Sequence, residues 1–218
     1  MYSCIGVKII EPLCAEATYA EALPSELTSL PSSRTLKVME IKFPLKKFGN
    51  QLWTRETARP IRSRLSDMLE TMRVGDVLVV DVSGVDIFDF SFASELFGKG
   101  LSRLGVEYPG RFVITEGLTE SARENLNQAL EASNLIMIER QGHELRLLGK
   151  VHQFDRDTFT GIVEAGEAVS AASLGKKLDL SPTAMNERLS KLNNLGVIRR
   201  EKSSSASGRE QFIYKVMG

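Results

Sequence analysis

The chain has 218 residues, of which 42% are hydrophobic and 26% charged, and its 28 basic and 28 acidic side chains cancel. This length allows two small domains, and the composition is that of ordinary soluble globular proteins. No apolar run is long enough to span a membrane and no secretory signal stands at the start, so we expect a cytoplasmic protein. Cys4 and Cys14, like His143 and His152, have no metal-ligand spacing.

The first elements are an extension, a strand and a helix. Residues 1–34 contain three prolines among small and polar residues, and we expect an extension outside the core. Apolar and polar side chains alternate over residues 35–43, which predicts a strand. Thr54 is expected to cap a helix that runs to Met72, with Pro60 bending it or delaying its start. Four arginines near its beginning predict a solvated face, with an anion or partner contact as the alternative: Arg55, Arg59, Arg62 and Arg64.

Strands and helices alternate through the next part of the chain. Residues 77–82 (VLVVDV) form an apolar run with one acid, typical of a strand buried on both faces. Helices are predicted over residues 91–104 and 119–133, and strands over 111–115 and 135–138. Residues 144–149 add an edge strand or begin a linker. This alternation predicts an α/β fold over residues 35–150, with helices packed on a small sheet.

One segment of this part carries a family resemblance. In residues 79–97 (VVDVSGVDIFDFSFASELF), an apolar strand ends in Asp81, a turn follows, and Ser91 opens a helix. The segment resembles the STAS fold of anti-sigma-factor antagonists and sulfate-transporter tails. It is more similar still to the uncharacterised STAS-like family, in which residues 91–97 (SFASELF) match the start of the helix. The resemblance covers residues 37–140 and implies a STAS-like domain that senses a signal or binds a partner.

The same resemblance makes Ser91 a candidate for regulatory phosphorylation. In partner-switching STAS proteins the phosphorylated hydroxyl lies in this turn, and Ser91 follows Asp89 by two positions. A phosphate at a helix N-terminus would be stabilised by the helix dipole. However, Phe90 and Phe92 replace the serine and the glycine of the family motif. The alternative is that Ser91 only caps its helix.

The C-terminal part carries a second pattern. Residues 151–160 are expected to link the two parts, and residues 158–165 to form a first helix. Ser170 is predicted to cap a second helix, and a tight turn at residues 179–180 leads to Ser181 and Pro182, which open a third. Gly196 ends that helix, and two strands follow around a polar tip at residues 203–208. The third helix is predicted to bury Ala184, Met185, Leu189, Leu192 and Leu195.

This order resembles the winged helix-turn-helix of many bacterial regulators, which implies a DNA-binding domain over residues 157–218. Residues 161–218 hold nine basic and six acidic side chains, a net charge of +3, which suits a phosphate backbone. The alternative is a domain of the same fold that binds protein.

Candidate DNA contacts fall into two sets. Side chains on the outward side or N-terminus of the predicted recognition helix can meet base edges or nearby phosphates: Ser181, Thr183, Ala184, Asn186, Glu187 and Ser190. Basic side chains can meet backbone phosphates: Lys176, Lys177, Arg188, Lys191, Arg199, Arg200, Lys202 and Arg209. An ion pair with Glu187 or Glu201 is the alternative for Arg188 or Arg199.

The sequence thus predicts a transcriptional regulator that binds double-stranded DNA, acts as a homodimer on paired half-sites, and needs no cofactor or membrane. No catalytic constellation is present, so we expect no enzymatic activity. Asp81, Asp86, Asp89 and Glu95 lie close in sequence and could hold a cation, although solvated charge is the favoured interpretation. The alternative function is a partner-switching adaptor, whose STAS-like domain binds an ATPase-type kinase and whose winged helix docks protein.

Overall fold

The computed structural model describes residues 38–204 and 208–217. Residues 37–218 form one compact unit, and the account below concerns this unit alone. The expected extension over residues 1–34 lies outside the described residues. So do residues 205–207, which make up half of the expected hairpin tip.

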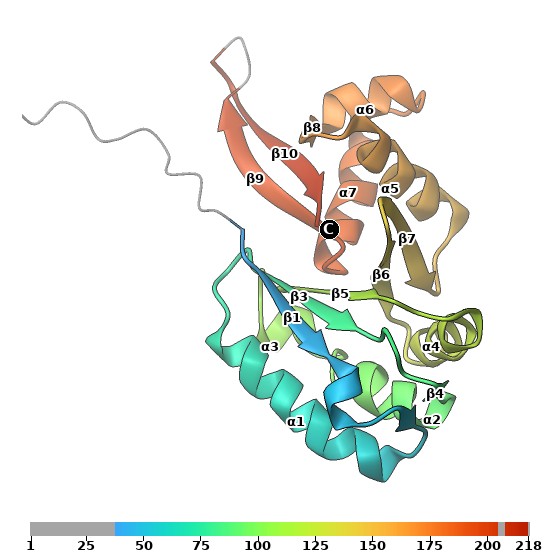
Figure 1. The fold of residues 1–218 in the computed structure, drawn as a ribbon. Helices are drawn as coiled ribbons and strands as arrows, with labels where there is room; N and C mark the ends of the chain where they lie inside the picture. Colours follow the sequence, from blue (N-terminus) through green and yellow to red (C-terminus); the bar gives the residue numbers. More distant parts are fainter. Residues whose placement is uncertain (1–37, 205–207, 218) are drawn as a thin grey trace, which may run out of the picture. The chain divides into compact units, whose positions relative to one another are not determined.

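A five-stranded sheet with the order β1-β3-β5-β6-β7 forms the centre of the α/β part (Figure 1). Strands β1 (Glu40–Pro44), β3 (Val77–Asp81), β5 (Phe112–Glu116) and β6 (Ile136–Gln141) are parallel. Strand β7 (Glu144–Gly149) runs antiparallel to β6 at the edge, which settles the expectation for residues 144–149 as an edge strand. The predicted α/β fold is therefore confirmed.

Helices cover one face of this sheet. Both α1 (Arg55–Thr71) and α4 (Glu120–Ala132) begin at capping threonines, because Thr54 accepts a hydrogen bond from the Thr57 amide and Thr119 from that of Ala122. Pro60 lies inside α1, so the expected delay of this helix is wrong. The Thr54 cap and four buried apolar side chains, from Ala58 to Leu69, hold the first turns in place despite the missing amide.

The single helix expected over residues 91–104 is helical only as far as Lys99. The segment divides into α2 (Phe90–Ala93), a π-helical turn η2 (Ser94–Lys99) and α3 (Leu104–Glu107). At Gly98, within η2, a Cβ atom would lie 2.5 Å from the Ser133 hydroxyl at the end of α4, so this turn packs closely against α4. The short strands β2 (Gln51–Leu52) and β4 (Ile87–Phe88), which pair in parallel, were also not expected. A 3-10 turn, η1 (Leu45–Phe48), follows β1.

The C-terminal part has the predicted winged helix-turn-helix arrangement. Its helices are α5 (Gln153–Ala165), α6 (Ala171–Lys177) and α7 (Pro182–Asn194), and the strands β8 (Val169–Ser170), β9 (Ile198–Ser204) and β10 (Glu210–Val216) form a sheet of order β8-β10-β9. Ser170 and Ser181 cap α6 and α7 as expected. Gly196 has a φ of 72°, the left-handed conformation predicted for the end of α7.

Two details of this part differ from the prediction. Helix α5 begins at Gln153 and not at Thr158, so most of the expected link is helical. The cause is tertiary, because Asp155 in its first turn is buried and pairs with Lys191 of α7. In α7, Met185, Leu189 and Leu192 are fully buried as predicted, whereas Ala184 and Leu195 are only partly buried.

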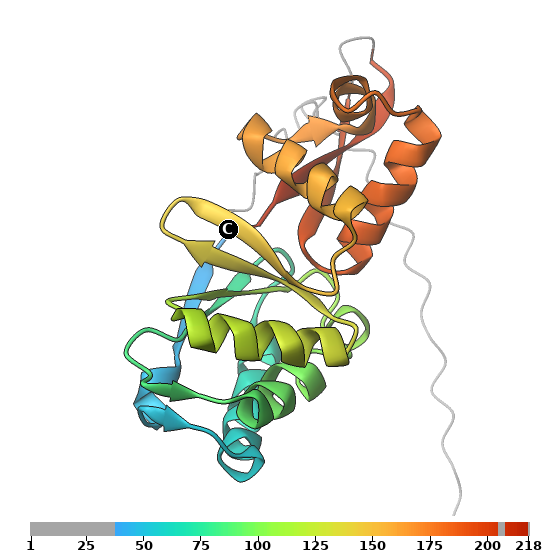
Figure 2. The ribbon, with the colours of Figure 1, turned by 90° about the vertical axis from the view of Figure 1, so that its right-hand side faces the viewer.

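The second face of the five-stranded sheet is covered by the winged part (Figures 1 and 2). The register places Val79, Ile114, Ile138 and Leu147 side by side on one face, because these residues are aligned partners in adjacent strands. They belong to the same buried cluster as Phe159 of α5, Met185 and Leu189 of α7 and Tyr214 of β10. The sheet is thus buried on both faces, as the apolar run over residues 77–82 predicts. In the described part of the chain, every helix is too short or too polar to cross a membrane.

Candidate nucleic-acid interface

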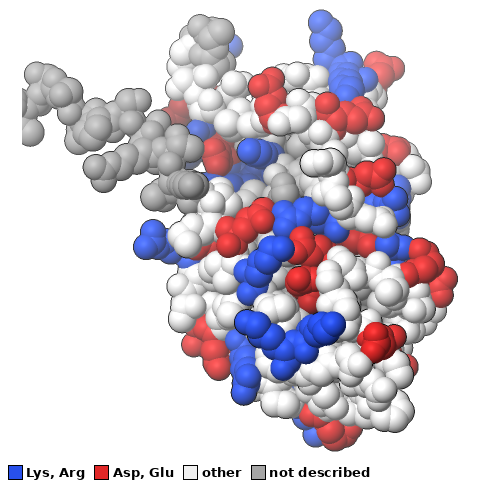
Figure 3. Space-filling view, viewed as in Figure 1, with Lys and Arg blue, Asp and Glu red and all other residues white. Residues whose placement is uncertain are grey.

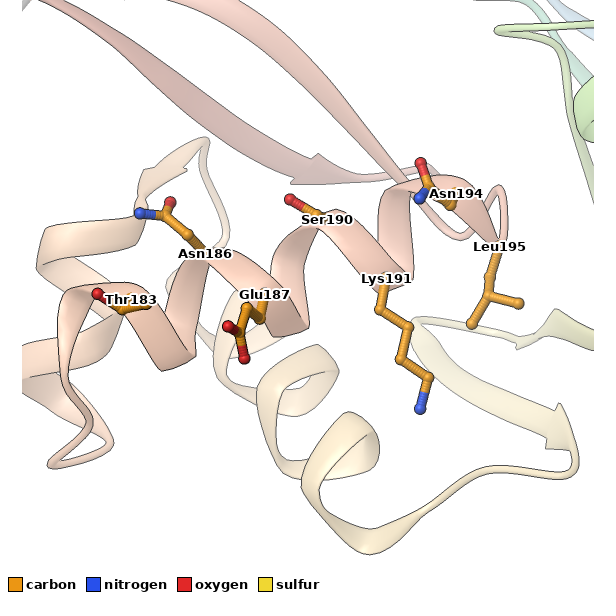
Figure 4. A pocket seen from close by; sticks show the side chains of 7 residues that line it. All are labelled: Thr183, Asn186, Glu187, Ser190, Lys191, Asn194 and Leu195. Atoms are coloured by element: carbon orange, nitrogen blue, oxygen red, sulfur yellow. The ribbon is translucent and has the colours of Figure 1, made fainter.

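Helix α7 presents two rows of polar side chains along its outer surface (Figure 4). One row contains Asn186, Ser190 and Asn194, and the other contains Glu187 and Lys191. Each row follows the four-residue spacing of a helix face. Together with Thr183 and Leu195, these residues line an open groove of about 670 Å³. The groove is held in position because Met185, Leu189 and Leu192 anchor the opposite side of the helix in the core.

The side chains of this groove can recognise base edges. An asparagine amide such as that of Asn186 can pair with adenine through two hydrogen bonds, and a carboxylate such as that of Glu187 can accept from cytosine. Both side chains are exposed, as is that of Thr183, while Ser190 is half-buried. Ser181 is also exposed, but its hydroxyl already accepts the amide hydrogen of Ala184 as a helix cap. The sequence-based set omitted Asn194, although its spacing from Ser190 could have revealed it.

Two of the predicted phosphate-binding lysines form ion pairs within the winged part. Lys191 Nζ lies 2.5 Å from Asp155 Oδ2, and Lys177 Nζ lies 2.8 Å from Glu164 Oε2. The first pair is half-buried because the Asp155 side chain is only 4% exposed. Either lysine would have to leave its carboxylate partner, or share it, to bind a phosphate.

Three arginines are also engaged. The guanidinium of Arg188 lies 4.8 Å from the centre of the Phe154 ring, and that of Arg200 lies 4.6 Å from the centre of the Phe212 ring. Arg199 Nε lies 2.8 Å from Glu201 Oε1, which confirms the ion pair considered for it. Its terminal nitrogens also approach the turn before β3, because a Cβ atom at Gly75 would lie 2.9 Å from one of them.

Four further positions of the predicted phosphate-binding set are exposed: Lys176, Arg200, Lys202 and Arg209. Lys176 and Lys202 are exposed, and neither forms an ion pair with any residue that the structure describes. Arg209, at the tip end of β10, is exposed too. The Arg200 guanidinium lies over the Phe212 ring, and the residue is exposed, so its N–H groups can still donate hydrogen bonds. Lys176 lies on α6, which comes before α7 in the sequence. Arg200, Lys202 and Arg209 lie on the β9–β10 hairpin, which comes after α7.

On the face drawn in Figure 3, the charges of the described residues do not gather into one large basic surface. Figure 3 shows basic and acidic side chains interspersed over β1 and its neighbours. There, Glu116 accepts hydrogen bonds from Lys42 at 2.8 Å and from Arg140 at 2.9 Å, and Arg140 also binds Glu40. Burial raises the pKa of Glu116, but the hydrogen bonds and charges of Lys42 and Arg140 outweigh burial and hold that pKa below its usual value.

Ser91 lies in the first turn of α2 and is half-buried. The cap of this helix is Asp89, whose Oδ1 accepts the amide hydrogen of Ser91 at 2.7 Å, so the expectation that Ser91 itself caps the helix is wrong. A phosphate on Ser91 would lie beside this carboxylate, and like charges so close repel each other. The geometry therefore adds no support to phosphorylation of Ser91.

The four acids considered as a cation site each have a separate role. Asp81 accepts from the Ser83 amide, Asp86 accepts from the Asn50 side chain at 2.6 Å, and Asp89 caps α2. Glu95 is buried and lies 2.6 Å from Lys99 Nζ and 2.9 Å from Arg62 Nη1. Among the described residues, His, Cys, Asp and Glu side chains form no group of three or more that could hold a metal ion.

Comparison with known proteins adds little to this description of the site. No family model matches the chain, so the resemblance to STAS-like proteins stays a prediction. No curated protein matches it either. Among solved structures, the chain is similar to a possible transcriptional regulator from Methanosarcina mazei Go1, with 17% identity and a TM-score of 0.29. The match covers 31% of this chain and 57% of that chain, and at this TM-score it carries no weight for function.

Proposed function

We propose that the protein is a transcriptional regulator that binds double-stranded DNA through its winged helix-turn-helix. The observation that carries the proposal is the surface of α7, where Asn186 and Glu187 are exposed beside Ser190 while Met185 and Leu189 fix the helix in the core. A recognition helix needs this combination, because it must be rigid and must present hydrogen-bonding groups to base edges.

In this proposal the phosphate contacts come from Lys176, Arg200, Lys202 and Arg209. Lys176 and Lys202 can bind a phosphate without breaking an ion pair to a described residue. By contrast, Lys177, Lys191 and Arg199 already pair with carboxylates, so we assign them structural roles first. The β9–β10 hairpin would then lie along the DNA backbone while α7 enters the major groove.

The α/β part would act as the sensing or partner-binding half, without catalytic activity. We expect a homodimer on DNA, because winged helix-turn-helix proteins commonly bind paired half-sites. The rival function is an adaptor whose winged part docks protein. The two functions differ in one physical property, since only DNA binding requires release of counterions from phosphates.

The test is a titration of the 218-residue protein into a pool of fluorescent duplexes at several salt concentrations, followed by anisotropy. The double variant Lys176→Ala/Lys202→Ala should lower the slope of log affinity against log salt by about 2, since each phosphate contact contributes about 1. The matched control is Lys47→Ala/Lys150→Ala, which removes two exposed lysines from the α/β part. The control should leave the slope unchanged.

Absence of binding at low salt would refute the DNA-binding proposal and favour the adaptor. Equal slopes for the two double variants would also contradict it, because the charge responsible would then not belong to the winged part.

A further inference from the structure

A cavity of about 510 Å³ lies where β5 and β6 begin and α7 ends. Its volume is within the range of small-molecule sites, about 300 to 1,000 Å³. Most of the lining is apolar and comes from the segment around α3, from the start of β6 and from the residues that follow α7. The main apolar side chains are Leu104, Val113, Leu130, Ile136, Met137 and Leu195. Such a lining suits the apolar body of an organic molecule.

Arg111 is the one charged residue among those that line the cavity. Its Nε donates a hydrogen bond to the Met72 carbonyl at 2.9 Å, and its guanidinium lies 5.9 Å from the centre of the Tyr108 ring. These contacts fix the side chain but use only one of its five N–H groups. No ion pair joins Arg111 to a carboxylate of the described residues, so none of these residues neutralises its positive charge.

Two amides add further polar groups at the other side. Asn193 and Asn194, at the end of α7, also line the cavity, and their side chains form no hydrogen bond with a described residue. In small-molecule sites, a small number of polar groups in an otherwise apolar lining usually fix the orientation of the ligand.

We propose that this cavity binds a small amphipathic organic anion, with its apolar body against Leu104 and Ile136 and its anionic head at Arg111. A neutral ligand of the same shape would leave the guanidinium without a partner. The ligand class is therefore a carboxylate or sulfonate attached to an aromatic or aliphatic body.

The position of the cavity gives such a ligand a route to α7. Asn194 and Leu195 line both this cavity and the outer groove of α7. A ligand that orders these two residues at the end of the groove should weaken the binding of DNA. This coupling is reciprocal, so DNA should weaken the binding of the ligand by the same factor. The coupling rests on the proposed DNA binding, whereas the cavity site does not.

Two fluorescent probes of similar aromatic body test the site in the 218-residue protein. One is the anion 8-anilinonaphthalene-1-sulfonate, and the other is the neutral N-phenyl-1-naphthylamine. Ser102→Trp fills the cavity from an exposed position, and Arg111→Met removes the charge but keeps a long side chain. The matched control is Arg103→Met, which removes an exposed arginine that pairs with Glu107 outside the cavity. Circular dichroism verifies that each variant is folded.

The proposal expects saturable binding of one anionic probe per chain. Ser102→Trp should abolish the binding of both probes. Arg111→Met should lower the affinity for the anionic probe roughly tenfold, since a hydrogen bond to a charged group contributes about that factor. It should leave the affinity for the neutral probe unchanged. Arg103→Met should change neither.

Two results would overturn the proposal. If Ser102→Trp leaves the binding of both probes unchanged, the cavity is not their site. If Arg111→Met and Arg103→Met weaken the anionic probe equally, the charge of Arg111 does not select the ligand. A protein that binds the probes as expected but binds no DNA would sustain the cavity site and refute the proposed function, so the two failures are distinguishable.

Discussion

Lys191 of α7 donates a hydrogen bond to the buried carboxylate of Asp155 in α5, with 2.5 Å between Nζ and Oδ2. The Asp155 side chain is 4% exposed and that of Lys191 is 48% exposed, so a buried carboxylate is paired with a partly solvated ammonium group. Asp155 also lies in the first turn of α5, where a negative charge is favoured by the helix dipole. This pair ties α7 to α5, across the intervening helix α6 in the sequence.

Substitution of Lys191 by methionine should therefore lower the stability of the protein. Lys191→Met leaves the Asp155 carboxylate buried without its partner, and we expect a loss of about 1 to 3 kcal/mol in the free energy of unfolding. Urea denaturation measures this loss. Lys176→Met is the control, because Lys176 is exposed and forms no described ion pair, and it should change stability by less than about 0.5 kcal/mol. Equal losses in the two variants would contradict a structural role for Lys191.

If the protein binds DNA as proposed, substitution of Asn186 should change which sequence is bound and not how salt affects binding. Once a preferred duplex has been selected from a random pool, Asn186→Ala should weaken its binding by about 1 to 3 kcal/mol, because an amide that reads a base is lost. The salt slope should stay the same, since no phosphate contact is removed. A variant that loses equal affinity for the selected duplex and for unrelated DNA would show that Asn186 reads no base.

Local signals account for the parts of the fold that the sequence predicted correctly. Thr54, Ser170 and Ser181 were recognisable as caps because a hydroxyl three residues before a free amide is a local feature. The buried strand β3 was recognisable from its continuous apolar run. By contrast, the pairing of β2 with β4 joins two-residue segments that lie 36 positions apart, and no local pattern indicates it.

The candidate interface shows the same division. The polar face of α7 was predictable from helical spacing, and most of its groove residues were in the predicted set. The partners of the basic side chains were not, because they depend on tertiary contacts. Lys191 meets Asp155 only once α5 packs on α7, and Arg188 meets Phe154 for the same reason. Sequence could therefore propose phosphate contacts but could not separate the accessible cations from the paired ones.

Gly149 should tolerate alanine far less well than Gly142 does. At Gly149, φ is 95° and a Cβ atom would lie 2.1 Å from the carbonyl oxygen of Leu135, which is backbone and cannot move aside. At Gly142, φ is 60° and no atom lies within 4 Å of a Cβ. We expect Gly142→Ala to cost about 1 kcal/mol of stability, from its left-handed backbone alone. Gly149→Ala should cost at least about 3 kcal/mol, since it adds overpacking to the same strain. Thermal denaturation of the two variants tests the difference, and equal melting temperatures would contradict it.

Glu95 should make the protein less stable in acid. The ion pair with Lys99, with the nearby charges of Arg62 and Arg59, holds the pKa of the buried Glu95 carboxyl below its usual value, although burial acts in the opposite direction. A carboxyl whose pKa is lower in the folded state stabilises that state above its unfolded pKa, about 4.3, and this contribution is lost as pH falls through the folded pKa.

The stability advantage of the wild type over Glu95→Gln should then be full at pH 6 and shrink towards pH 3 in urea titrations. Glu107→Gln, at an exposed pair with Arg103, is the control and should show a small difference at every pH. A wild-type advantage over Glu95→Gln that is the same at pH 3 and pH 6 would mean that the ionised carboxylate does not stabilise the packing of η2 against α1.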